Sequence, residues 1–221
     1  MNSSPGKQEI RFEKVLCPIG TVSIRRTTRE DLIRAKSLLN TGILAEDGPD
    51  NFKNTGCYNA KCPGFVQTDN TIYIGSRVAQ TSIYGGEMFE LVIYLYQDQH
   101  TKNWWLNIEN KDIGYFPAAL FSNLDSAHEV GWGGKTTTHM GTSSPPMGSG
   151  YFPDDNFVHA CYFIHIAYQN ETSHDKDYSP EVDQTKRFSD KEKCFGVEYY
   201  GDQKGQVGYS LQLGGPGGAC D

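Results

Sequence analysis

The chain has 221 residues, enough for one domain to bury a core without outside support, and a formal net charge of −7 at pH 7. Its acids are scattered and no run of Lys and Arg could neutralise a phosphate backbone, so nucleic acid is not an expected partner. No stretch approaches the roughly 20 apolar residues that a membrane-spanning helix needs, so no membrane insertion is expected.

The 24 glycines, 13 tyrosines and 11 phenylalanines favour short strands joined by tight turns, and the predicted fold is mainly β. One amphipathic helix is predicted within Thr27–Asn40, where a Thr cap and early acids precede apolar residues at helical spacing. The polar segment Gly42–Asn54 then indicates a linker. We therefore expect two regions, residues 1–50 and residues 51–221.

Beyond the linker, strands are predicted wherever aromatic and branched residues gather between turn residues. In one of these segments, Met88–Tyr96, apolar or aromatic residues point to both faces, so both faces are expected to be partly covered and two sheets to pack together. Thr136–Gly150 is predicted to be a surface loop, because its two prolines remove ladder donors. The predicted strands are Thr71–Ala79, Met88–Tyr96, Trp104–Ile108, Val158–Tyr168, Phe195–Tyr200 and Val207–Leu213.

Six cysteines form no paired Cys-x-x-Cys set of the zinc-ribbon type, so disulfides are the better interpretation. Disulfides imply an oxidising compartment, and Asn170 is a candidate glycosylation site consistent with one. The polar segment Met1–Ile10, however, lacks the apolar core of a signal peptide. Either the protein stays in the cytosol or its amino terminus is incompletely represented.

Two motifs, Gly56-Cys57-Tyr58-Asn59 and Cys62-Pro63-Gly64-Phe65-Val66-Gln67, resemble a segment of the neprosin family, plant glutamic endopeptidases that cut next to proline. Cys17–Arg26 resembles the end of that family's activation peptide. The resemblance implies a secreted protein and an antiparallel, jelly-roll-like β-sandwich. Further motifs follow the family's order: Asn103–Leu106, Gly114–Phe121, Trp132-Gly133-Gly134, Met147–Pro153 and Gly214–Gly217.

The same resemblance implies a mechanism with two glutamates, and the sequence departs from it twice. One glutamate directly follows the Trp-Gly-Gly motif, where this chain has Lys135. The other belongs to a long stretch before the Gly-Cys-Tyr-Asn motif, in whose place only Asn40–Asn54 stands. Paired carboxylates hydrolyse peptides because one is ionised and the other protonated, and a charged lysine cannot accept a proton. We therefore expect an incomplete sandwich with no catalytic residues, no cofactor and no peptidase activity.

Aromatic side chains are the main candidates for ligand contacts, because their faces stack on proline rings and on sugars. Ordinary core packing is the alternative, and it is favoured for whichever of Trp104 and Trp105 faces inward. The candidates for a substrate groove are Trp105, Tyr115, Phe116, Trp132 and Tyr151.

A period of two places His159, Cys161 and His165 on one face of a predicted strand, the pattern of a metal site. No fourth ligand is evident, so a half-buried face with an unpaired cysteine is preferred and no metal is expected. The family resemblance implies the disulfides Cys57–Cys62 and Cys194–Cys220. The remaining Cys17 and Cys161 could pair with each other, but Cys17 belongs to the segment that resembles an activation peptide, and we expect both to be free.

Three functions remain open from the sequence. The first is a neprosin-type peptidase by descent that has lost its activity. The second is a secreted module whose aromatic groove binds proline-rich peptides or cell-wall polymers without cutting them. The third is an incomplete gene product without a folded function.

Overall fold

The computed structural model describes residues 8–12, 64–121, 126–127, 129–138, 141–169 and 177–220. These residues form strands, paired in antiparallel sheets apart from one short parallel pair, with two single turns of 3-10 helix, η2 (Ala118–Leu120) and η3 (Val182–Gln184). The all-β fold class is confirmed. The sandwich or jelly-roll arrangement stays a prediction, and the predicted helix and linker lie outside the described residues.

The chain divides into two compact units. One unit comprises the described residues of Gln8–Thr81 and Phe89–Asp125, and the other those of Ser82–Met88 and Ser126–Asp221. We call them the first-sheet unit and the second-sheet unit. In the part of the chain that the structure describes, no helix has the length and apolar character needed to cross a membrane.

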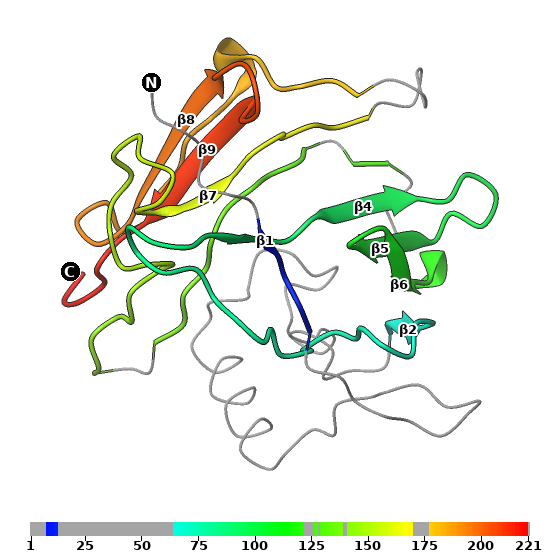
Figure 1. Cartoon of the computed structure of the whole chain (residues 1–221). Coiled ribbons are helices and arrows are strands. Elements are labelled where there is room, and N and C mark those ends of the chain that lie inside the picture. The colour runs from blue at the N-terminus through cyan, green and yellow to red at the C-terminus, as the bar shows by residue number, and fades with distance from the viewer. Residues whose placement is uncertain are drawn as a thin grey trace. The chain divides into compact units, whose positions relative to one another are not determined.

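The first-sheet unit contains a four-stranded antiparallel sheet in the order β2-β6-β5-β4 (Figure 1). Its strands are β2 (Val66–Gln67), β6 (Lys111–Phe116), β5 (Trp104–Ile108) and β4 (Ile93–Gln97). The β5 bounds agree with the prediction, because a run of tryptophan, leucine and isoleucine is typical of a strand. The sequence does not predict β6, whose first half has low strand propensity and is held by pairing with β5.

Two of the predicted strands in this unit are wrong in extent. Met88–Tyr96 is not continuous but breaks into β3 (Phe89–Glu90), which pairs in parallel with β1 (Gln8–Glu9), and β4. Thr71–Ala79 forms turns, with only an isolated bridge at Val78. The turn begins where the Asp69 carboxylate accepts hydrogen bonds from the backbone N–H groups of the next residues, which competes with strand pairing.

On β4 the side chains of both faces are partly covered and partly exposed, and the packing of two sheets stays a prediction. The relative exposures of Ile93, Tyr94 and Leu95 are 53%, 55% and 61%. The strand is outermost in its sheet, and among the described residues it pairs with β5 alone. Side chains on both of its faces therefore contact solvent.

The second-sheet unit contains three antiparallel strands, β7 (Cys161–Phe163), β9 (Tyr209–Gly214) and β8 (Gly196–Asp202), with β9 in the middle (Figure 1). β8 and β9 confirm two predicted strands, whereas the predicted Val158–Tyr168 is wrong in extent because only three of its residues pair as β7. The described part of Thr136–Gly150 forms a loop with isolated bridges, as predicted.

Alternation along β9 gives its sheet one apolar and one polar face. Leu211 and Leu213 point to the apolar face, where they form a core with Ile166. Ser210 and Gln212 point to the opposite face, and both are 0% exposed. A fully buried glutamine must find hydrogen-bond partners, and these partners position the loop described below.

A disulfide joins Cys194, just before β8, to Cys220 near the carboxyl terminus, with a Cα–Cα distance of 5.7 Å. This pairing is confirmed, and so is the prediction that Cys161 is free. The predicted pair Cys57–Cys62, Cys17 and the glycosylation candidate Asn170 lie outside the described residues.

Candidate functional site

Gln212 anchors a polar loop on the buried polar face of the second sheet. Its side-chain Oε1 accepts hydrogen bonds from the backbone N–H groups of Asp154 at 3.1 Å and Asp155 at 2.9 Å, and from the Tyr200 hydroxyl at 2.8 Å. Its Nε2 donates to the backbone oxygen of Asn156 at 2.9 Å. One buried side chain thus fixes three consecutive loop residues, so the loop is held by the strand beneath it.

This loop presents a carboxylate to an imidazole. Asp154 Oδ2 lies 2.6 Å from His159 Nδ1, and Asn156 Nδ2 lies 3.2 Å from His159 Nε2. Both contacts are satisfied when the neutral ring carries its proton on Nδ1, donates to the carboxylate and accepts from the amide. The hydrogen bond from His159, assisted by the N–H of Asn156, lowers the pKa of Asp154, so the carboxylate stays ionised.

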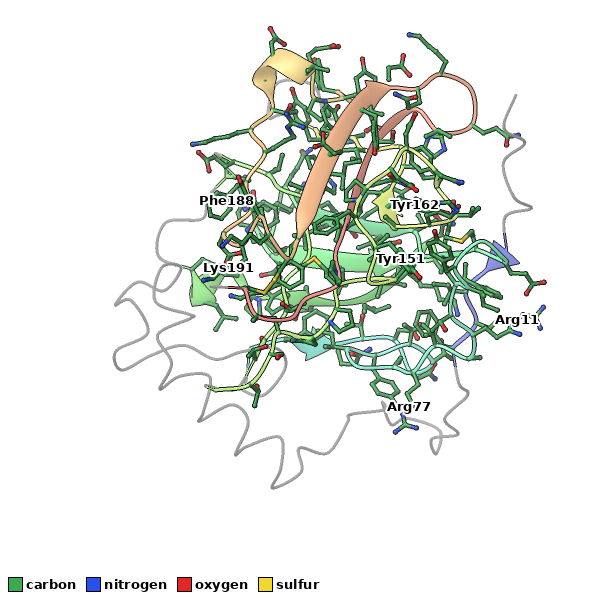
Figure 2. All side chains as sticks on the ribbon, turned by 90° about the vertical axis from the view of Figure 1, so that its left-hand side faces the viewer. Arg11, Arg77, Tyr151, Tyr162, Phe188 and Lys191 are labelled. Carbon is green, nitrogen blue, oxygen red and sulfur yellow. A yellow bond between two sulfur atoms is a disulfide. The ribbon has the colours of Figure 1, made fainter. Side chains whose placement is uncertain are left out.

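Two tyrosine rings lie beside this pair. The Tyr84 ring lies parallel to the His159 ring, with centroids 4.5 Å apart, and 4.1 Å from the ring of Tyr151, whose side chain can be followed in Figure 2. Tyr84 sits in a tight turn that Gly85 permits with a φ of +67°. The N–H of Gly85 donates to the backbone oxygen of Val158 at 2.8 Å, which docks the turn next to His159. We call Tyr84, Tyr151, Asp154 and His159 the tyrosine–histidine cluster.

The polar contacts of His159 hold its ring in one orientation. A histidine base activates a nucleophile within hydrogen-bond reach, but in the described residues the polar contacts of His159 are only those with Asp154 and Asn156. The ring nitrogen facing away from the carboxylate is occupied by an amide. The pair therefore orients the imidazole as a stacking surface for Tyr84.

The Trp-Gly-Gly motif packs against the apolar face of the second sheet. Trp132 is half-buried and packs against the core of Ile166, Leu211 and Leu213, and its place in a substrate groove stays a prediction. A Cβ at Gly134 would lie 2.8 Å from Met147 Sδ and 2.9 Å from Leu213 Cδ1, so glycine permits this close approach. Lys135 follows immediately and is exposed.

In the first-sheet unit, the candidates Trp105 and Tyr115 face each other across β5 and β6, with ring centroids 4.7 Å apart. Tyr96 on β4 pairs with Trp105 on the same face and extends the line, which we call the aromatic row. Phe116 instead packs edge-on against Phe65 at 4.9 Å. The structure thus brings together two of the predicted groove residues and adds one that the sequence prediction omits.

The predicted His-Cys-His face does not form. Cys161 lies in β7, but His159 precedes that strand in a turn and His165 follows it with a φ of +52°. Within the described ranges, no group of three His, Cys, Asp or Glu side chains could hold a metal ion.

The fold and these sites define a disulfide-bonded all-β protein whose polar loop is anchored on a central strand. A family model described as Neprosin matches residues 41–216, which is most of the chain. The chain belongs to the neprosin family, a family of proline-directed endopeptidases.

Proposed function

We propose that this neprosin-family protein does not hydrolyse peptide bonds. The observation that supports the proposal is Lys135, which directly follows Trp132-Gly133-Gly134, where the family resemblance implies one of two glutamates. An ammonium group only donates hydrogen bonds, so it cannot take a proton from water. Its positive charge also favours the ionised form of a neighbouring carboxyl group, which opposes service as an acid.

Three aspartates of the described residues have the opposite character to a general acid. A general acid for peptide cleavage needs a raised pKa, as burial or a second carboxylate would give it. At Asp98, Asp154 and Asp202 the pKa is instead lowered, in each case chiefly by a side-chain hydrogen bond, from Thr101, His159 and Lys204 respectively. Each is held as an anion.

The test is digestion of a proline-rich peptide by the purified protein from about pH 2.5 to 6, read by mass spectrometry, since acid–base catalysis contributes about 10²- to 10⁴-fold per group. We expect no cleavage above a mock purification, with wild type or with Lys135→Glu, because one restored glutamate lacks its partner. Proline-directed cleavage by wild type in the presence of inhibitors of other protease classes would overturn the proposal.

A second candidate function, binding without cleavage, is favoured by the aromatic row. Three rings on neighbouring strands form a continuous face, and Tyr96 is 38% exposed. Such a face suits proline rings or sugars, so we propose proline-rich peptides or cell-wall polymers as ligands. The Cys194–Cys220 disulfide supports secretion into an oxidising compartment, where these ligands are found. Pull-down by an immobilised proline-rich peptide should weaken in Trp105→Ala but not in the exposed Phe188→Ala, and equal capture of both variants would contradict the role of the row.

A further inference from the structure

The tyrosine–histidine cluster exposes aromatic surface that the fold does not use. Tyr84 and Tyr151 are 46% and 51% exposed although their ring centroids lie only 4.1 Å apart. Throughout the described residues neither hydroxyl has a hydrogen-bond partner. Exposed, ordered rings with unused polar ends are typical of ligand-contact surfaces, because folding alone gains little from them.

The cluster is also held in place before any ligand arrives. Tyr84 is fixed by its stack on His159, His159 by the Asp154 carboxylate, and Asp154 by its backbone bond to the buried Gln212. The chain of contacts ends on the central strand of the second sheet. A surface ordered in advance loses little conformational entropy on binding, which favours recognition of a weakly interacting ligand.

The polar groups beside the rings select among ligands. The Asp154 side chain is 45% exposed and ionised, so it offers acceptors and no donor. The carboxylate already accepts hydrogen bonds from His159 and from the N–H of Asn156, and a proline ring, which has no N–H, could give it no further donor. A sugar ring offers a flat C–H face for the tyrosine and hydroxyl donors for the carboxylate.

We infer that Tyr84, Tyr151 and Asp154 form a binding site for a neutral carbohydrate ring. A C–H face of the sugar lies on the exposed ring of Tyr151, which the neighbouring Tyr84 ring supports, and a sugar hydroxyl donates to Asp154. An acidic sugar is disfavoured, because its carboxylate would face that of Asp154. The inference rests on the proposed binding function but uses a different set of rings from the aromatic row, so each can fail alone.

The test is affinity electrophoresis of the full chain in gels containing soluble xylan, soluble β-glucan or polygalacturonate. We expect retardation by at least one neutral polymer and none by polygalacturonate. Tyr151→Ala and Asp154→Asn should each weaken binding about tenfold, and Tyr151→Phe should retain it because the ring remains. Tyr94→Ala removes an equally exposed tyrosine from β4 and should bind like wild type.

Thermal melts of all variants separate loss of binding from loss of folding. The inference is overturned if no neutral polymer retards the protein, or if Tyr151→Ala binds the polymer as tightly as wild type. It is equally overturned if Tyr151→Phe weakens polymer binding as much as Tyr151→Ala does. It is also overturned if Tyr151→Ala abolishes binding of a proline-rich peptide while xylan and β-glucan binding persist. Retardation by xylan or β-glucan that persists in Trp105→Ala but weakens in Tyr151→Ala supports the sugar site and separates it from the aromatic row.

Discussion

Gln212 is the residue on which the polar loop depends. Gln212→Leu keeps a similar volume but removes the acceptor for two backbone N–H groups and the Tyr200 hydroxyl. Leaving such donors unsatisfied costs about 1–3 kcal/mol, so the free energy of unfolding should fall by about that amount in urea titrations. Gln99→Leu, at an exposed turn position, should change it by less than about 0.5 kcal/mol. Equal effects of the two substitutions would contradict the anchoring role.

Asp154 should make stability depend on acid pH. Its pKa is lowered in the folded protein, so the Asp154–His159 bond contributes fully above the ordinary aspartate pKa of 3.8 and is lost as pH falls through the folded value. Denaturant titrations should therefore show Asp154→Asn less stable than wild type at neutral pH, with the difference shrinking below pH 3.8. Asp190→Asn, which replaces an exposed acid, is the matched control. A stability difference between Asp154→Asn and wild type that persists unchanged in acid would contradict this account.

Among the structural elements, the Trp-Gly-Gly segment offers a matched pair of glycines. A Cβ at Gly134 meets Met147 and Leu213 below 3.0 Å, whereas a Cβ at Gly133 has no atom within 4 Å. Gly134→Ala must displace the ends of these two side chains and should lower the free energy of unfolding by about 1 kcal/mol. Gly133→Ala should be neutral in the same titration. A neutral Gly134→Ala would show that the motif does not pack as described.

β4 is an outer strand with exposed apolar side chains and no charged residue between Ile93 and Gln97. Such edges tend to pair with other chains, and a lysine on the edge opposes that pairing. Leu95→Lys should leave stability within about 0.5 kcal/mol of wild type and reduce concentration-dependent association in sedimentation velocity. Val182→Lys places the same charge at an exposed site outside the strands and should not reduce association.

The local sequence predicts those strands whose residues have a high intrinsic β-propensity. β5, β8 and β9 follow from branched and aromatic residues, and the Cys194–Cys220 pair from the family's motifs. The sequence does not predict β6, because pairing with β5 and not its own composition makes this segment a strand. The sequence does not predict the tyrosine–histidine cluster either, because its anchoring contact is long-range. Gln212 is 58 residues from Asp154 in sequence, and no local pattern indicates that the two are in contact.

At the scale of the whole molecule, the Cys194–Cys220 disulfide links two residues that are 26 apart in sequence and closes a loop of chain that contains β8 and β9. Replacing both cysteines by serine should lower the free energy of unfolding by about 2–4 kcal/mol, chiefly by freeing the unfolded chain. Cys161→Ser, at the free thiol, should have little effect in the same titration. A cooperative transition in wild type would also argue against an incomplete product without a fold.

The central claim is that this neprosin-family chain does not catalyse peptide hydrolysis. Incubation with a proline-containing protein substrate in water enriched in heavy oxygen tests it most directly, because hydrolysis places a solvent oxygen in each new carboxyl terminus. We predict no labelled termini beyond those of a mock purification, at any acid pH. Labelled peptides that end in proline, in amounts proportional to the added protein, would contradict the claim.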